Sequence, residues 1–191
     1  MNAQSSEWVL CIMWALEHRV ISKYMKKCYL TDLLLADVPS LVRVYTDPVT
    51  RKYLGGPLSG SVAELRALED VKKLQDLPVW AIRVTESHDF VGTISLDNHH
   101  DGLDIEVSYE LLPEFMGKGY ATEALSLVLS YAFNEIKLQK LIAETQTKNK
   151  SSVKLLKRAG FSFERNLIRY ESHQAIYSIT NHLYFNREGK N

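Results

Sequence analysis

The stretch LLPEFMGKGYATEA, at residues 111–124, constrains the fold more than any other part of the chain. A strand-like alternation precedes it, and from Ala121 the apolar residues recur at the three- and four-residue spacing of a helix. Gly117 and Gly119 let the backbone take positive φ and approach a ligand closely, and successive N–H groups there can form an anion-binding nest. The first helical turn adds further unpaired N–H groups at the positive end of the helix dipole. The stretch therefore predicts a strand, an anion-binding loop and a helix in succession.

The two glycines do not by themselves identify the ligand of this loop. A turn without any ligand would explain the same residues. A dinucleotide-binding fingerprint would place a third glycine three residues after Gly119, where the chain has Thr122. A P-loop would follow Lys118 with Ser or Thr, and here Gly119 follows it. Pyrophosphate or phosphate remains the class of ligand that the loop predicts.

The composition is that of an ordinary folded domain of 191 residues. The 23 basic and 23 acidic residues balance, so we expect no nucleic-acid partner. The longest apolar run, at residues 8–16, is too short to span a bilayer and follows no basic segment, so we expect neither a membrane partner nor a signal peptide. Cys11 and Cys28 are interpreted as free thiols of a cytoplasmic protein. His99 and His100 are neighbours that would point to opposite faces of a strand, so no metal site is predicted.

Around the loop, strand-like and helix-like segments alternate, which predicts one α/β domain at residues 25–191. Residues 1–24 are interpreted as an extension that could be helical and could supply a homodimer contact through Trp8 and Trp14. Predicted strands lie at 29–35, 80–85, 90–96, 105–112, 140–147, 163–170 and 175–184. The alternation of the fourth places Glu106, Ser108 and Glu110 on one face.

Four helices are predicted between these strands. Asp37 caps the first, which has Pro39 in its first turn. The second begins at a capping box of Ser61 and Glu64 and runs to about residue 75. The third covers about 121–134, and the fourth runs from Asn149 to Gly160, a glycine suited to the left-handed position after a helix. The side chains expected in the core from the second helix are Leu65, Leu68 and Val71.

Two blocks together resemble the GNAT superfamily of N-acetyltransferases, in the branch similar to ribosomal-protein N-terminal (serine/alanine) acetyltransferases. They are IEVSYELLPEFMGKGYATEA at 105–124 and NKSSVKLLKRAGF at 149–161. The resemblance implies a GNAT fold of class α/β (α+β), with a mixed, mostly antiparallel sheet of about six to seven strands and about four flanking helices. The sheet would be splayed where the parallel strands 105–112 and 140–147 diverge. The implied activity is acetyl transfer from acetyl-CoA to a primary amine, either a protein N-terminus or a small molecule.

The resemblance also assigns the acetyl-CoA site residue by residue. The pantetheine arm would pair with the backbone near Leu111 and Leu112, and the N–H near Leu112 would polarise the thioester carbonyl. Asn149, which also fits a helix cap, would contact the same arm, and Ser152 would lie close to the thioester sulfur. The pyrophosphate would be bound by the backbone of Met116, Gly117, Lys118, Gly119, Tyr120 and Ala121.

The proton-transfer residues are less directly implied. Leu156 stands where many family members carry a tyrosine general acid, so Ser152 is the predicted proton donor. Deprotonating an α-amino group at pH 7 costs about 1.4 kcal/mol, against roughly 4–5 kcal/mol for a lysine, so a modest base suffices for the former. Glu106, with Glu110 as second choice, is the predicted base. Acidic residues on the loops expected around the acceptor are Asp47, Asp97, Asp101 and Glu171. The competing hypothesis is a GNAT-fold CoA sensor or interaction module that transfers no acetyl group.

Overall fold

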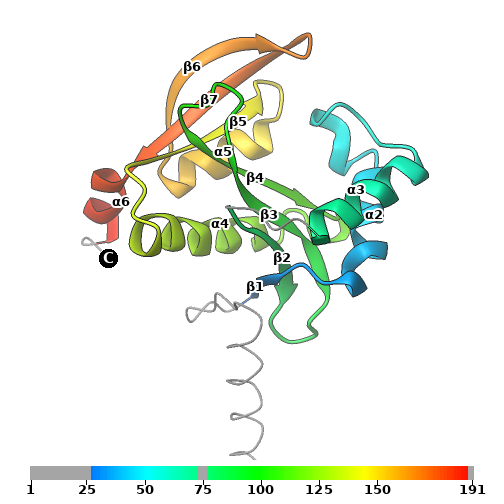
Figure 1. The fold of residues 1–191 in the computed structure, drawn as a ribbon. Coiled ribbons are helices and arrows are strands. Elements are labelled where there is room, and N and C mark those ends of the chain that lie inside the picture. Colours follow the sequence, from blue (N-terminus) through cyan, green and yellow to red (C-terminus); the bar gives the residue numbers. More distant parts are fainter. Residues whose placement is uncertain (1–26, 73–76, 189–191) are drawn as a thin grey trace, which may run out of the picture.

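The computed structural model describes residues 27–72 and 77–188, so the predicted extension at 1–24 lies outside the described part (Figure 1). Its seven-stranded sheet has the order β1-β2-β3-β4-β5-β7-β6. The strands are β1 (Cys28–Asp32), β2 (Val79–Val84), β3 (Phe90–Asn98), β4 (Ile105–Leu111), β5 (Lys140–Gln146), β6 (Ser162–Arg169) and β7 (Ser172–Thr180). The α-helices of the described residues are α2 (Val38–Thr46), α3 (Gly60–Lys72), α4 (Tyr120–Ser130), α5 (Lys150–Ala159) and α6 (Asn181–Glu188).

The sheet is splayed in its centre, as the resemblance to the GNAT superfamily implies. Every neighbouring pair of strands is antiparallel except β4 and β5, which run parallel and pair at one position, Glu106 with Ile142. Two residues further along β5, the N–H of Glu144 donates to Oε1 of Glu106 at 3.1 Å. A side-chain oxygen of β4 therefore accepts the hydrogen bond that a backbone carbonyl would accept in a continuous parallel sheet. Beyond this point β4 and β5 pair at no further residue and diverge (Figure 1); we call the unpaired region between the two backbones the gap.

Helices cover both faces of this sheet. The larger core lies between the strands and α4 and α5, and includes Trp80, Leu111 and Phe133. The smaller core joins α2 and α3 to Leu112. Because neighbouring residues at the end of a strand point to opposite faces, Leu111 and Leu112 show that the two helix pairs lie on opposite faces. Figure 1 shows α2 and α3 together, away from α4 and α5.

The second predicted helix differs from its prediction in which residues it buries. α3 begins at Gly60, so Ser61 lies inside the helix and does not cap it. Its buried residues are Ala63 and Ala67, whereas Leu65, predicted in the core, is 64% exposed. Val71 is partly buried against the smaller core, Leu68 is half-buried, and Leu65 turns toward solvent because the small side chains of Ala63 and Ala67 form the contact with α2.

Two further predictions are corrected at the ends of other elements. Asp37 precedes α2 but does not cap it, because its carboxylate accepts hydrogen bonds from Arg83 and from the N–H of Leu34. The last predicted strand ends at Thr180 instead of residue 184, and α6 follows it. The ring of Tyr184 stacks on that of Phe133 at 5.0 Å, so tertiary packing favours the helix over a longer strand. None of the described helices is both long and apolar enough to cross a membrane.

Candidate functional site

The loop between β4 and α4 carries unpaired backbone N–H groups. Gly117 and Gly119 have φ of 74° and 94°, a conformation that strongly favours glycine. Within residues 27–72 and 77–188, no protein acceptor is found for the N–H groups of residues 117–121, at the start of α4. The N–H of Met116 is already bonded to the carbonyl of Pro113 at 3.1 Å, so the nest begins one residue later than predicted. The ammonium of Lys27 binds the carbonyl of Lys118 at 2.9 Å and adds positive charge beside the loop.

One edge of the gap between β4 and β5 is formed by the backbone of β4. The N–H of Leu112 donates to the carbonyl of Val91 in β3 at 2.9 Å, so the donor predicted near Leu112 is not the N–H of Leu112 itself. Because N–H groups alternate in direction along a strand, those of Tyr109 and Leu111 face the gap. The carbonyl of Leu111 accepts a hydrogen bond of 2.8 Å from the hydroxyl of Thr50. The backbone donors available in the gap are therefore the N–H groups of Tyr109 and Leu111, and the N–H of Leu112 is not among them.

A pair of hydroxyl groups lies on the α5 side of the sheet. Asn149 caps α5 as predicted, with its Oδ1 accepting the N–H of Ser152 at 3.2 Å, and Gly160 ends the helix at a φ of 98°. This cap places Ser152 in the first turn, where its Oγ lies 2.8 Å from Oη of Tyr109. Burial raises the pKa of Tyr109 to about 12, against the lowering effect of the Ser152 hydrogen bond. Tyr109 is therefore a neutral hydroxyl near pH 7 and can donate its proton to Ser152.

Tyr109 was not among the site residues predicted from the sequence. Its partner Ser152 is 43 residues away, so no local pattern joins them. The one available signal was its position two residues before Leu111 on the same side of the strand. Leu156, by contrast, is a fully buried residue of α5 that packs in the core, and its apolar side chain has no proton to donate.

The two candidate bases on β4 lie in different surroundings. Oε1 of Glu110 is 3.0 Å from Nη1 of Arg51, and both side chains are largely buried. Burial raises the pKa of Glu110, while the charge of Arg51 opposes this. Burial also raises the pKa of Glu106, and within residues 27–72 and 77–188 its carboxylate accepts a hydrogen bond from the backbone N–H of Glu144 alone. Glu110 therefore belongs to a buried ion pair, and Glu106 is the carboxylate better suited to accept a proton.

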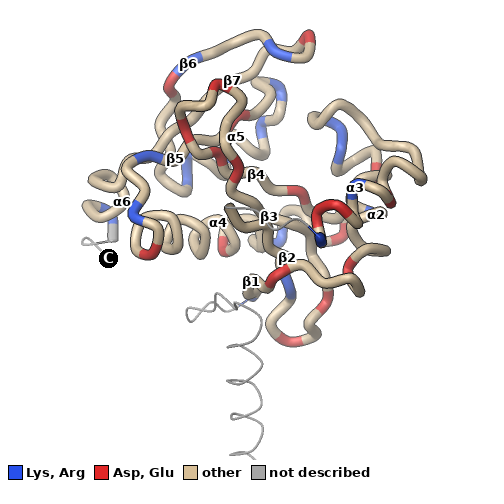
Figure 2. Tube along the Cα trace, in the orientation of Figure 1, with Lys and Arg blue, Asp and Glu red and all other residues tan. Residues whose placement is uncertain are grey.

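Acidic residues gather on the same face of the sheet as Glu106. Asp97 pairs directly with Glu106 across β3 and β4, an arrangement of like charges that destabilises a sheet when nothing compensates it. Figure 2 shows acidic positions along β4 and β5 in this part of the molecule. Of the predicted loop acids, Asp47 instead caps the turn at 50–53 through the N–H groups of residues 49 and 50. Glu171 lies in the β6–β7 turn with a φ of 55°.

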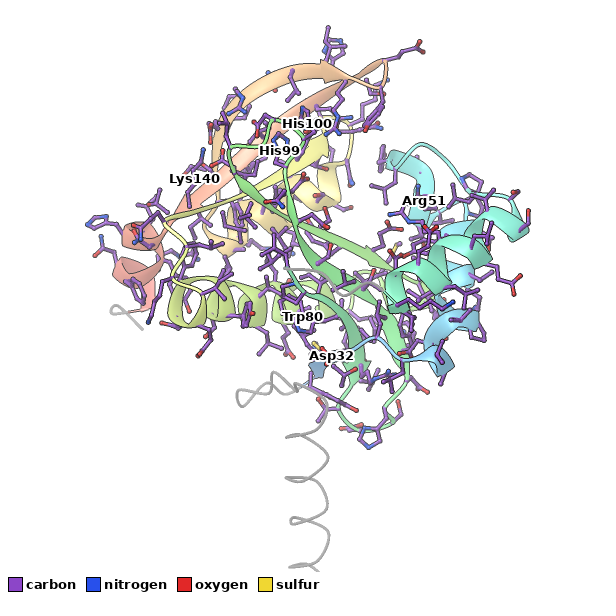
Figure 3. All side chains as sticks on the ribbon, viewed as in Figure 1. Asp32, Arg51, Trp80, His99, His100 and Lys140 are labelled. Atoms are coloured by element: carbon purple, nitrogen blue, oxygen red, sulfur yellow. The ribbon has the colours of Figure 1, made fainter. Side chains whose placement is uncertain are left out.

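His99 and His100 come together, contrary to the argument from strand alternation. β3 ends at Asn98, so both histidines lie in the following turn, and their ring centroids are 4.0 Å apart. Nε2 of His99 lies 2.9 Å from Oε2 of Glu144, and Nδ1 lies 2.9 Å from Oδ1 of Asp101. Burial on its own lowers the pKa of His99, but the two carboxylates outweigh it and raise that pKa. Figure 3 labels both rings, close to β5 and the β6–β7 hairpin.

Comparison with known proteins agrees with this geometry. Residues 28–162 match the family model described as an acetyltransferase (GNAT) domain. The chain is 27% identical over 78% of its length to the uncharacterized N-acetyltransferase p20 of Bacillus licheniformis, of which it covers 86%. It is 28% identical to the spermidine N(1)-acetyltransferase of Escherichia coli K12, over 44% of each chain.

Solved structures share the fold. A GNAT-family acetyltransferase from Bacillus anthracis superimposes with a TM-score of 0.72 and 19% identity, covering 82% of this chain and 96% of that one. The spermidine N-acetyltransferase from Vibrio cholerae, solved with CoA and spermine, gives a TM-score of 0.71 and 20% identity, covering 83% and 98%. At these identities the likeness concerns the fold, and the predicted GNAT fold is confirmed.

Proposed function

Since the chain belongs to the GNAT family of acetyltransferases and is an N-acetyltransferase with acetyl-CoA as its co-substrate, we propose that its acceptor is the primary amine of a small cationic molecule such as a polyamine. One observation carries the proposal: the gap between β4 and β5 has the Tyr109–Ser152 hydroxyl pair on one face and the acidic residues around Glu106 on the other. A donor of protons and an acceptor of protons thus flank one opening in the sheet.

Acetyl-CoA supplies an acetyl group activated as a thioester, and the residues of the chain fit its parts. The free N–H groups at 117–121, the dipole of α4 and the ammonium of Lys27 suit the pyrophosphate. The backbone groups of Tyr109 and Leu111 suit the amides of the pantetheine arm, because both face the gap. Asn149 keeps a side-chain N–H₂ for the same arm while its oxygen caps α5.

In the proposed reaction the amine nitrogen bonds to the thioester carbonyl carbon, the carbon–sulfur bond breaks, and the departing sulfur takes a proton. Glu106 would accept the proton of the amine at its carboxylate, directly or through water. Ser152 would donate to the sulfur and regain a proton from Tyr109. Tyr109 would then regain a proton from solvent, and Glu106 would release its proton to solvent. A raised pKa suits Glu106 to this work, since a general base is most effective when its pKa lies near the working pH.

A cationic acceptor is favoured by the facing carboxylates Asp97 and Glu106. A positive charge between them would offset the repulsion that their pairing imposes. The relative from Escherichia coli is named for acetylation of spermidine, which is such a cation. The branch that acts on protein N-termini, predicted from the sequence, remains the competing expectation for the acceptor.

The experiment is thiol release from acetyl-CoA with a panel of spermidine, spermine, a neutral amine and peptides beginning with Ser or Ala. We expect the highest kcat/KM with the polyamines. Asp97→Asn should raise KM for spermidine about tenfold, the effect of a loss of roughly 1.4 kcal/mol, while Glu171→Gln, a matched loss of charge in the hairpin turn, should leave KM unchanged. A peptide preferred over spermidine would overturn the proposed acceptor. Binding of acetyl-CoA by calorimetry without thiol release for any amine would favour the CoA-sensor hypothesis.

A further inference from the structure

We propose that His99, His100 and Glu144 bind one divalent metal ion, of which Zn²⁺ fits best. Acetyl transfer does not require this ion. The three ligand atoms lie within 4.8 Å of one another. Oε2 of Glu144 is 2.9 Å from Nε2 of His99 and 3.7 Å from Nδ1 of His100. A tetrahedral zinc ion with bonds of 2.0–2.1 Å separates its ligand atoms by about 3.3 Å. The present separations fall on either side of that value, so small side-chain rotations complete the site.

The kind of ion follows from the ligand set. Two imidazole nitrogens and one carboxylate oxygen suit Zn²⁺, whereas Mg²⁺ and Ca²⁺ prefer sites made of oxygen alone. Three protein ligands leave a fourth position for water or another group. His99 belongs to the turn after β3, as does His100, and Glu144 lies in β5, so the site joins two parts of the sheet.

Asp101 holds the ring of His99 from the opposite side. Its Oδ1 lies 2.9 Å from Nδ1, and the N–H of Leu103 and the guanidinium of Arg165 fix its carboxylate in turn. A carboxylate beside the far nitrogen of a metal-binding histidine is the usual support of such a ligand. A protonated imidazole donates to both Asp101 and Glu144, whereas a neutral one donates to only one of them. A metal ion between Nε2 and Glu144 would take the place of the proton on Nε2, while Nδ1 still faces Asp101.

His99 is also unusual in its burial. Its side chain is 0% exposed, and its Nδ1 makes no well-aligned hydrogen bond although Asp101 is close. The turn therefore holds a fully buried ring with Nε2 directed at a carboxylate of a neighbouring strand. Among the described residues, this is the group of His, Cys, Asp and Glu side chains with metal-binding spacing.

The guanidinium of Arg169 occupies the position that the metal ion would take between His100 and Glu144. Its Nη1 lies 2.7 Å from Nδ1 of His100 and 3.3 Å from Oε2 of Glu144. Arg169 is the last residue of β6, beside the exposed turn at Tyr170, so its side chain has solvent to move into. The guanidinium and the metal ion require the same two ligand atoms and therefore compete. Removing the guanidinium is expected to tighten metal binding.

The test uses the full chain, freed of metal with a chelator and then titrated with Zn²⁺ by calorimetry and by competition with a chromophoric chelator. We expect one ion per chain. His100→Ala and Glu144→Gln should each weaken binding at least tenfold, Asp101→Asn should weaken it about 10–100-fold, and Arg169→Ala should tighten it. His173→Ala, which removes an exposed histidine of β7 outside the cluster, is the matched control and should leave the affinity unchanged.

His100 is the decisive position, because its side chain is 37% exposed and its replacement leaves the core intact. Circular dichroism and thermal unfolding verify that each variant is folded. X-ray absorption of the zinc-loaded chain should find only nitrogen and oxygen neighbours. Equal affinity in wild type and His100→Ala overturns the site, and so does the lack of stoichiometric binding in both wild type and Arg169→Ala.

Discussion

Replacing Arg51 with methionine tests whether Glu110 serves the structure or the chemistry. The guanidinium makes four hydrogen bonds: 3.0 and 3.2 Å to the two carboxylate oxygens of Glu110, 2.7 Å to the carbonyl of Leu54 and 3.2 Å to that of Gly56. The side chain of Arg51 is 9% exposed and that of Glu110 is 16% exposed, so water cannot replace most of these contacts. Arg51→Met therefore leaves a buried carboxylate without its counter-charge.

Removing one partner of a buried ion pair costs about 3–5 kcal/mol, which is a large part of the roughly 5–15 kcal/mol that stabilises a typical domain. For a chain of this size that corresponds to a fall in Tm of roughly 6–20 °C. Replacing Glu110 with methionine as well removes the stranded charge, and apolar pairs substitute for buried ion pairs at little net cost. The double variant should recover to within about 1–2 kcal/mol of wild type, the remainder reflecting two carbonyls left without donors.

Urea unfolding monitored by circular dichroism measures all three variants, and acetyl transfer is assayed on those that are folded. An Arg51→Met loss below about 1 kcal/mol would refute the reasoning, because only a solvent-screened pair behaves in that way. If the stable double variant loses kcat by more than about 10²-fold, Glu110 and not Glu106 is the general base. Retention of kcat in that variant would assign Glu110 to the structure alone.

Four other substitutions separate structural from chemical roles. Gly92→Ala would place its Cβ 2.1 Å from a backbone carbonyl oxygen of β4, so we expect the free energy of unfolding to fall by about 3 kcal/mol or more, as measured by thermal unfolding. Gly60→Ala is the control, because nothing lies within 4 Å of a Cβ there. A fall in Tm no larger than that of Gly60→Ala would contradict the clash. Asn149→Ala should cost about 0.5–2 kcal/mol of stability as a lost helix cap; unchanged stability with a raised KM for acetyl-CoA would make its role cofactor contact alone. Ser152→Ala should lower kcat about 10²-fold or more and Tyr109→Phe by less, because water can replace the second donor; a loss of only a few-fold for Ser152→Ala would rule out the serine as proton donor.

The parts of the fold that the sequence predicted well are those decided by neighbouring residues. The loop at 111–124 needed positive φ at two positions, and glycine occupies both. Asn149 caps α5 and Gly160 ends it, each through contacts within a few residues. The switch from two-residue to helical periodicity at Ala121 located α4 for the same reason.

The failed predictions depended on distant contacts. A helix with several apolar residues can bury more than one stripe, and only the position of α2 selects Ala63 and Ala67 over Leu65. The convergence of His99 and His100 depends on β3 ending at Asn98, because strand alternation no longer governs side-chain direction past that residue. Boundaries of this kind are set by the pairing strand, which the local sequence does not record.

Glu106 and Glu110 illustrate why residue type and spacing left the catalytic assignment open. They lie four residues apart on one face of β4, and the sequence treats them as near equivalents. Arg51, 59 residues from Glu110, forms an ion pair with one of them. The other accepts the backbone N–H of Glu144 from β5 and lies opposite Asp97 of β3, and the charges of His99 and Arg169 act on it without a direct ion pair among the described residues. Under the proposed function, the carboxylate without a direct ion pair, Glu106, is the one that attracts a cationic amine and takes its proton. The difference between a structural and a reactive acid therefore resides in partners contributed by other elements, and the separation of β4 from β5 brings those partners to the acid.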